Sequence, residues 1–122
     1  MKYFHFSQNN SGGHFCFYEP EGITHHVVIQ AKDADDANNR AVGIGLYFDG
    51  CENGQDCECC GDRWYPVGLW KAEGDPEPMV YGEPVTAFKG PAWGKAGKEI
   101  AVHHADGRIE WFGVAKVTGE TK

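Results

Sequence analysis

Two stretches near the start of the chain alternate between phenylalanine and other side chains. They are residues 2–7 (KYFHFS) and residues 14–18 (HFCFY). Because successive side chains of a β-strand point to opposite faces of the sheet, each stretch predicts a strand with one aromatic face. The residues between them, 8–13 (QNNSGG), are of the kinds that form turns. We therefore predict an antiparallel hairpin in which residues 2–7 pair with residues 14–18.

A third strand and a helix are predicted next. Residues 23–31 (ITHHVVIQA) are rich in β-branched side chains, which favour strands. Three aspartates then precede alanines at helical spacing, and negative charge stabilises a helix N-terminus. This pattern predicts a helix over about residues 33–43. The short apolar stretch 46–48 (LYF) predicts a further strand that would complete a strand-helix-strand unit.

A second hairpin is predicted over residues 98–114. The dipeptide Asp106-Gly107 is a typical hairpin turn, and alternating runs flank it on both sides. The cross-strand pairs that we expect are His104 with Ile109 and His103 with Glu110.

The elements together predict the fold class. Residues 49–99 are rich in cysteine, proline and glycine, which indicates loops and turns. We therefore expect an α+β fold: a small, mostly antiparallel sheet that carries one helix (about 33–43) and a Cys-rich, Gly/Pro-rich loop region. The length of 122 residues fits a single domain, residues 1–122.

Composition and charge narrow the class of protein. No stretch approaches the run of about 20 apolar residues that crosses a bilayer, and the chain starts on strand-like sequence rather than an export leader. The expected compartment is the cytoplasm. The net charge is −7, and the acidic excess lies in residues 1–62. Phosphates repel such a surface, so we expect no direct binding to nucleic acid or membrane and favour a partner protein with a basic surface.

Four of the five cysteines lie close together and predict a metal site. Cys57 and Cys60 form a C-x2-C pair followed by glycine, a spacing that can hold tetrahedral Zn²⁺, and Cys51 lies within reach as a third ligand. As the fourth ligand we expect His25, and the spacing leaves His26 and Cys59 open as alternatives. Four protein ligands leave no open position, so this zinc would brace the loop rather than perform chemistry.

Two interpretations of the cysteine cluster do not involve a metal. Reduced thiols pack as small hydrophobic side chains. A redox pair of the thioredoxin kind needs a helix N-terminus to lower the thiol pKa, and residues 61–66 (GDRWYP) predict no helix.

Three other groups of residues are candidates for chemistry. His5, His14 and His25 could share the sheet face opposite the phenylalanines and form an imidazole cluster for a metal or for proton transfer; the alternative is ordinary cross-strand packing. Residues 9–13 could form a nest of backbone amides for an anion, or simply a turn. A basic patch around Trp93 could hold a small nucleotide; its cations are Lys89, Lys95 and Lys98. No hydrolase signature such as HExxH or G-x-S-x-G is present.

Two motifs in the first half carry a resemblance to a family. They are residues 4–13 (FHFSQNNSGG) and residues 56–64 (DCECCGDRW), and through them the chain resembles a family of small uncharacterised proteins of tailed phages. The resemblance covers about residues 1–66 and implies a phage origin and action in the host cytoplasm. The family pattern does not include Cys51. The residues that the resemblance shares are Asn9, Asn10, Ser11, Gly12, Gly13, Cys57, Cys59, Cys60, Gly61, Asp62, Arg63 and Trp64.

Three classes of function follow as hypotheses. The first is a phage-encoded accessory protein that binds and inhibits a host protein, such as a defence component with a basic nucleic-acid-binding surface. The second is a module that binds or sequesters a small nucleotide. The third is a metal- or thiol-dependent enzyme that uses His25 or His26 with the cysteines. An edge strand of so small a sheet could also pair with a second copy, which would give a homodimer.

Overall fold

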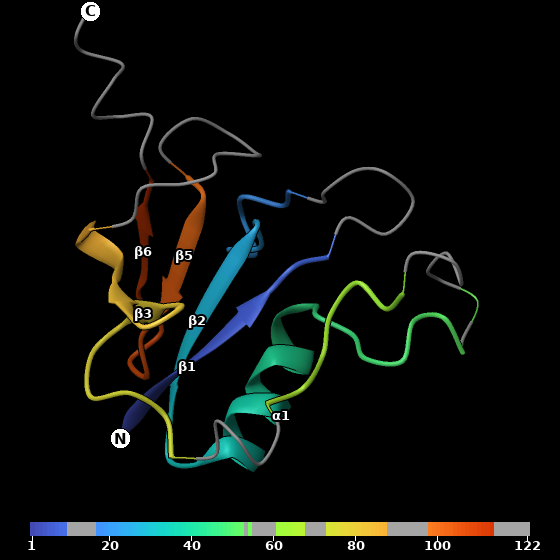
Figure 1. Cartoon of the computed structure of the whole chain (residues 1–122), viewed down its shortest axis with the longest axis horizontal. Coiled ribbons are helices and arrows are strands. Elements are labelled where there is room, and N and C mark those ends of the chain that lie inside the picture. Colours follow the sequence, from blue (N-terminus) through green and yellow to red (C-terminus); the bar gives the residue numbers. More distant parts are fainter. Residues whose placement is uncertain (10–16, 53, 55–60, 68–72, 88–97, 114–122) are drawn as a thin grey trace, which may run out of the picture.

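A four-stranded sheet forms the centre of the protein, with strand order β1-β2-β5-β6 (Figure 1). The computed structural model describes residues 1–9, 17–52, 54, 61–67, 73–87 and 98–113. The β1–β2 and β5–β6 pairs are antiparallel and the β2–β5 pair is parallel, so the predicted α+β fold with a mostly antiparallel sheet is confirmed. The strands of this sheet are β1 (Lys2–Ser7), β2 (His26–Ala31), β5 (Ile100–His103) and β6 (Ile109–Phe112).

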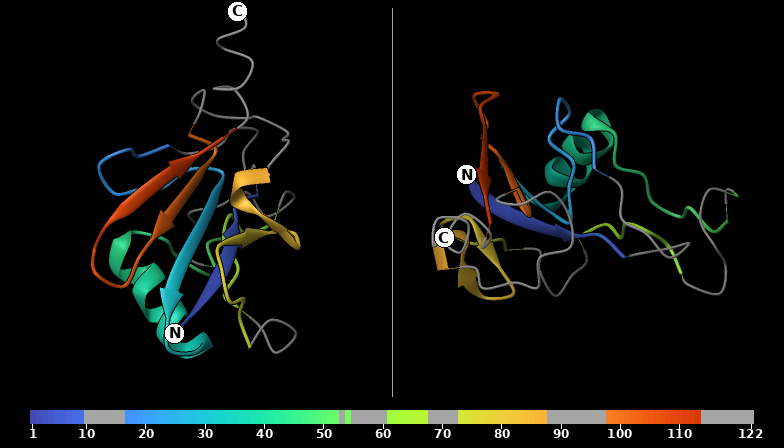
Figure 2. Two further views of the ribbon diagram at one scale, coloured as in Figure 1. Left: turned by 90° about the vertical axis from the view of Figure 1, so that its left-hand side faces the viewer. Right: turned by 90° about the horizontal axis from the view of Figure 1, so that it is seen from above.

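The remaining elements lie on the two sides of this sheet. Helix α1 (Ala34–Ile44) packs against one side. A small hairpin of β3 (Met79–Val80) and β4 (Glu83–Pro84) is followed by the 3-10 helix η3 (Val85–Ala87), and these pack on the other. The view from above shows the sheet between them (Figure 2). No helix in the described part of the chain is long and apolar enough to cross a membrane.

Register divides the sheet residues between two faces. We call the side against which α1 packs the helix face and the other side the far face. The rows on the helix face are Phe4, Ile29, His103, Ile109 and Phe6, Val27, Ala101, Trp111. Rows on the far face include His5, Val28, Val102, Glu110 and Ser7, His26, Ile100, Phe112. The phenylalanines of β1 therefore share one face, as their alternation predicts.

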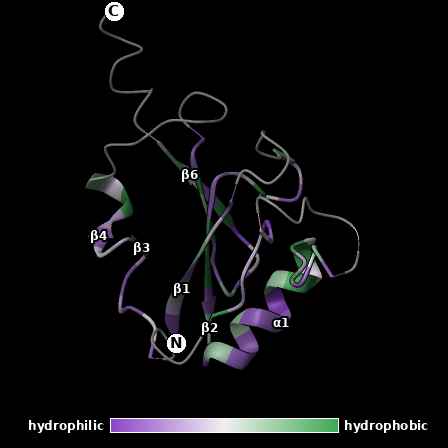
Figure 3. Ribbon diagram, turned by 45° about the vertical axis from the view of Figure 1, so that its right-hand side comes forward, coloured by the Kyte–Doolittle hydropathy of each residue, from purple (hydrophilic) through white to green (hydrophobic). Residues whose placement is uncertain are grey.

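Strand β2 carries apolar side chains on both faces because both are covered. Val27 and Ile29 belong to the helix-face core with Phe4 and Phe6. Val28 belongs to the far-face core, to which the segment of β3, β4 and η3 contributes Val80 and Val85. Hydrophobic colour accordingly prevails along the central strands, whereas α1 is largely hydrophilic (Figure 3).

Helix α1 matches the prediction closely. Asp33 caps its first turn, since its side chain accepts a hydrogen bond of 2.8 Å from the amide of Asp36. The helix ends at Ile44, and Gly45 follows with φ +120°. The strand expected at 46–48 does not form with any described residue, because Leu46 turns inward and packs in the helix-face core.

The predicted hairpin of residues 2–7 with 14–18 is wrong in its pairing. Strand β1 pairs along its length with β2, and Tyr18 instead forms an isolated bridge with Ile23. Pairing with β2 places Phe4 opposite Ile29 and Phe6 opposite Val27, so that large apolar side chains are buried together. Residues 10–16 lie outside the described part.

The second hairpin forms, but its register differs by one residue from the prediction. His103 lies opposite Ile109, because the loop has three residues and ends on Gly107 with φ +96°. A shift of one residue moves every side chain to the other face. Consequently Val102 lies opposite Glu110, and His104 rather than His103 contacts Glu110 from the same face, with its Nε2 2.8 Å from Oε1.

Candidate functional site

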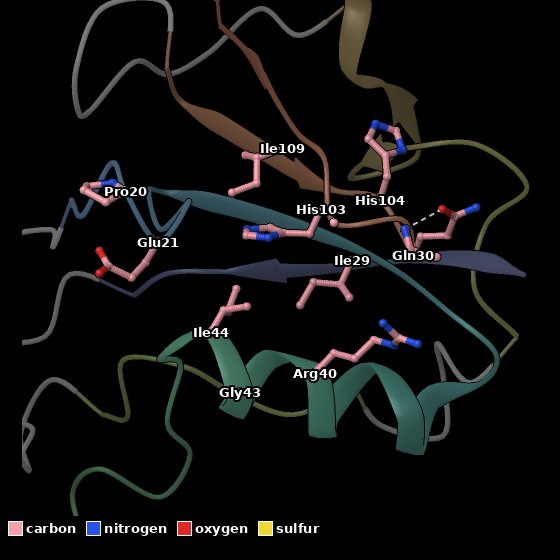
Figure 4. A pocket seen from close by; sticks show the side chains of 12 residues that line it. Pro20, Glu21, Ile29, Gln30, Arg40, Gly43, Ile44, His103, His104 and Ile109 are labelled. Carbon is pink, nitrogen blue, oxygen red and sulfur yellow. Dashed lines mark hydrogen bonds between the residues drawn. The ribbon is translucent and has the colours of Figure 1, made fainter.

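A pocket lies between α1 and the β5–β6 hairpin, and we call it the α1 pocket (Figure 4). Its volume is about 490 Å³. The pocket exists because α1 packs mainly on β2 and buries only two small side chains, Ala37 and Ala41. The part of the helix face formed by β5 and β6 is left open beside the helix.

The middle of the α1 pocket is apolar. Figure 4 shows the ring of His103 between Ile109 on one side and Ile29 and Ile44 on the other. Ile29, His103 and Ile109 come from one row of the sheet, and Ile44 comes from the last turn of α1. The sheet and the helix thus present flat apolar walls to a space of ligand size.

His103 is held as a neutral imidazole with a defined tautomer. Its Nε2 lies 2.8 Å from the carbonyl oxygen of Gly22, and because a carbonyl only accepts, Nε2 carries the proton. Burial lowers the pKa of His103, although the bond to Gly22 opposes the shift. Gly22 has φ +72°, and a Cβ there would lie 2.6 Å from the imidazole ring. Glycine is therefore required where this loop closes over His103.

One end of the α1 pocket presents hydrogen-bond donors. Arg40 donates through Nε to Asp36 at 3.0 Å, an interaction that helps to hold the pKa of Asp36 below its usual range after the larger effect of the Lys32 amide. Gln30 alternates with Ile29 and so lies on the far face, where its Oε1 accepts from the amide of Ala105 at 2.8 Å.

The opposite end presents an acceptor. In Figure 4 Glu21 lies at the far end of the pocket from Arg40, with the isoleucines and His103 between them. A carboxylate only accepts hydrogen bonds, and a guanidinium only donates them. The pocket therefore has a cationic donor end, an apolar middle and an anionic acceptor end.

The family of the chain is shown by its sequence over nearly the whole length. A family model described as a domain of unknown function (DUF7296) matches residues 1–119. The chain belongs to this family. No curated protein and no solved structure matches it. This family match extends beyond residue 66 or so, where the resemblance carried by the two sequence motifs ends.

Both motifs in this DUF7296 domain meet in space. The guanidinium of Arg63 donates to Oε1 of Gln8 at 2.8 Å, and the amide of Asn9 donates to the Arg63 carbonyl at the same distance. Asn9 also donates through its side chain to the carbonyl of Asp62 at 3.1 Å. Arg63 is 5% exposed, so this junction is buried. It anchors the end of the cysteine loop to the end of β1.

The predicted imidazole cluster forms on the far face, with a different membership. His5 Nε2 lies 2.8 Å from His26 Nδ1, and the ring of His25 stacks on that of His26 at 4.1 Å. Tyr81 contacts both His5 and His26 edge-on. His14, the third member expected from the sequence, lies outside the described residues.

Burial keeps two of these histidines neutral. It lowers the pKa of His26 to about 3, with smaller contributions from His5 and His25, and that of His25 to about 4. Neutral imidazoles are suited to packing and to metal binding alike. Among the residues that the structure describes, no three His, Cys, Asp or Glu side chains are arranged to hold a metal ion.

The predicted zinc ligands are only partly described. The ring of His25 stacks on that of His26. Cys51 is partly buried, and its amide donates to Oδ1 of Asp62 at 2.9 Å. Cys57 and Cys60, with the alternative ligand Cys59, lie outside the described residues. The zinc site therefore stays a prediction.

Two further candidates from the sequence are placed in part. Lys98 forms an ion pair with Glu19 and lies 5.2 Å above the ring of Trp111. The other members of that basic patch, Lys89, Lys95 and Trp93, are outside the described part, as is the turn 10–13.

His104 links Glu110 to the hydroxyl of Tyr3, which lies 3.2 Å from His104 Nδ1.

Proposed function

We propose that the protein is a binding module for a small organic ligand, which it holds in the α1 pocket. The observation that carries this proposal is the composition of the pocket walls. A volume of about 490 Å³ lies in the usual range of ligand sites, and such sites combine apolar walls with a few converging polar groups. His103, Arg40 and Glu21 supply those polar groups.

This proposal belongs to the second of the three classes expected from the sequence. The first hypothesis, that a phage-encoded protein inhibits a host protein, rests on the acidic first half of the chain and on the two motifs. It stays a prediction. The enzyme hypothesis placed its chemistry at the cysteines with His25 or His26. Ligand binding is preferred because it rests on a cavity whose lining residues are all described.

A pocket-filling substitution tests the proposal. Gly43 lines the pocket, and a Cβ added there meets no atom within 4 Å, so Gly43→Trp places a large ring at the opening without disturbing the core. Val42→Trp is the matched control, because Val42 is 55% exposed on the same helix and does not line the pocket. The probe is anilinonaphthalene sulfonate, an amphiphilic anion whose fluorescence rises in an apolar site.

We expect Gly43→Trp to weaken binding of this dye by about tenfold or more, since it removes the apolar contact area. Val42→Trp should bind like the unmodified protein. Circular dichroism checks that both variants are folded. Equal dye affinity in the two variants would show that the α1 pocket is not the binding site.

A further inference from the structure

We propose that the ligand of the α1 pocket is a nucleoside monophosphate whose base carries an exocyclic amino group. This inference rests on the proposed function and assigns the two ends of the ligand to the two ends of the pocket. The phosphate lies at Arg40, the base lies among His103 and the isoleucines, and the amino group faces Glu21.

The donor end is suited to a phosphate. A guanidinium has five N–H donors, and the interaction with Asp36 uses only the Nε donor of Arg40. Its planar fork matches phosphate oxygens, and the Arg40 side chain is 40% exposed, so its outer nitrogens are accessible. Asp36 orients the fork from behind, as an i,i+4 pair on the same helix.

The middle of the pocket is suited to a planar ring. An imidazole stacks on nucleobases, and isoleucine side chains give flat apolar contact without polar atoms. His103 adds a specific feature, because its Nε2–H is committed to Gly22 and its Nδ1 can only accept. A base held here meets acceptors rather than donors as it extends toward Glu21.

The acceptor end selects for an amino group. A carboxylate accepts from an exocyclic amine in the way that Glu and Asp accept from cytosine in DNA readout. A base with a carbonyl at that position sets an acceptor against the Glu21 carboxylate, so the two oxygens repel each other and form no hydrogen bond. With one cationic end and an overall charge of −7, the protein is suited to a single nucleotide and not to a polymer.

Calorimetry on the full chain tests the assignment with matched ligands. Adenosine monophosphate and cytidine monophosphate carry the amino group, inosine and uridine monophosphates carry a carbonyl in its place, and adenosine lacks the phosphate. We expect the aminated monophosphates to bind about tenfold or more tightly than either their carbonyl counterparts or adenosine, because each loss removes a charge-assisted hydrogen bond between the ligand and the pocket.

Two variants separate the two ends. Glu21→Gln should abolish the preference for the amino group, because an amide both donates and accepts, and should retain the preference for the phosphate. Arg40→Gln should do the reverse. Lys32→Gln and Glu77→Gln are the controls: each removes one exposed charge outside the pocket and should change neither preference.

The outcomes distinguish this inference from the proposed function. If the aminated monophosphates do not bind, or bind no better than the carbonyl compounds and adenosine, the nucleotide assignment is wrong. The function as a binding module then still stands if dye binding depends on Gly43→Trp. If Gly43→Trp leaves the affinity for the dye unchanged, the proposed function and the assignment both fail.

Discussion

His26 illustrates how the position of a residue in this sheet sets its charge. It belongs to central strand β2, is 1% exposed, and shares the far face with the rings of His5 and Tyr81. Charging it would place a cation among other imidazoles with little access to water. His26 is therefore neutral in the folded state, whereas in the unfolded chain it takes up a proton with an ordinary pKa near 6.5.

We predict that acid destabilises the protein through this residue. Since the pKa of His26 is about 3 when folded, the unfolded state binds more protons between about pH 6.5 and pH 3, and stability falls as pH falls through that window. From about pH 7 to pH 5 the loss from His26 alone is about 2 kcal/mol in the free energy of unfolding. Urea denaturation at several pH values measures it.

The variant His26→Asn removes this titration and keeps a polar side chain on the far face. It should show a clearly weaker dependence of stability on pH than the unmodified protein. His25, whose pKa is also lowered, still contributes in the same direction, so some dependence should remain. An unchanged pH dependence in His26→Asn would contradict the prediction.

At the scale of elements, the β3–β4 turn carries backbone strain. Tyr81 and Gly82 are its two central residues, and both have positive φ, +53° and +82°, as a type I′ turn requires. Asn and Gly are favoured at the first of these positions and tyrosine is not. The ring of Tyr81 nevertheless lies against His5, and its hydroxyl lies 2.8 Å from that of Ser7.

A pair of substitutions separates the turn from the ring. Tyr81→Ala removes the ring and keeps the backbone strain, whereas Tyr81→Asn removes the ring and relieves the strain. We expect Tyr81→Asn to be more stable than Tyr81→Ala by about 1 kcal/mol, measured by urea denaturation. The result to watch is the order of the two variants, since an alanine variant that is at least as stable would show that the turn is not strained.

The elements themselves could largely be predicted, because their periodicity is local. Phenylalanines two residues apart identified β1, and aspartates before spaced alanines identified α1. The partner of β1 could not be predicted, since pairing depends on which strand buries the phenylalanines best, and β2 offers Val27 and Ile29. The hairpin register was missed because Asp106-Gly107 fits both a two-residue and a three-residue loop.

The candidate site was less predictable than the fold. The α1 pocket depends on how far the helix extends over the sheet, and the signal in the sequence is that Ala37 and Ala41 are the only buried residues of α1. Small side chains bring a helix close to one strand and leave its neighbours uncovered. Arg40 and Glu21 resemble any charged surface residue until the pocket between them is known.

At the scale of the whole molecule, one measurement tests both the predicted zinc site and the predicted homodimer. Native mass spectrometry of protein purified without added metal gives the bound mass and the number of subunits. If Cys51, Cys57, Cys60 and His25 hold structural zinc, the spectrum shows one zinc per chain and Cys57→Ser loses it together with stability. Cys16→Ser, outside the predicted ligand set, is the control. A metal-free mass, or equally mild effects of both substitutions, would contradict the zinc prediction.

The walls of the α1 pocket come from three parts of the chain that are far apart in sequence: strand β2 with the loop before it, helix α1 and the β5–β6 hairpin. A ligand that contacts all three acts as a noncovalent cross-link, and it binds the folded chain but not the unfolded one. Thermodynamic linkage then adds about 2.7 kcal/mol to stability when the ligand is present at about a hundred times its Kd. For a chain of this size that gain raises the melting temperature by several degrees, so a simple thermal-shift screen of metabolite mixtures can find the ligand without an assay of activity.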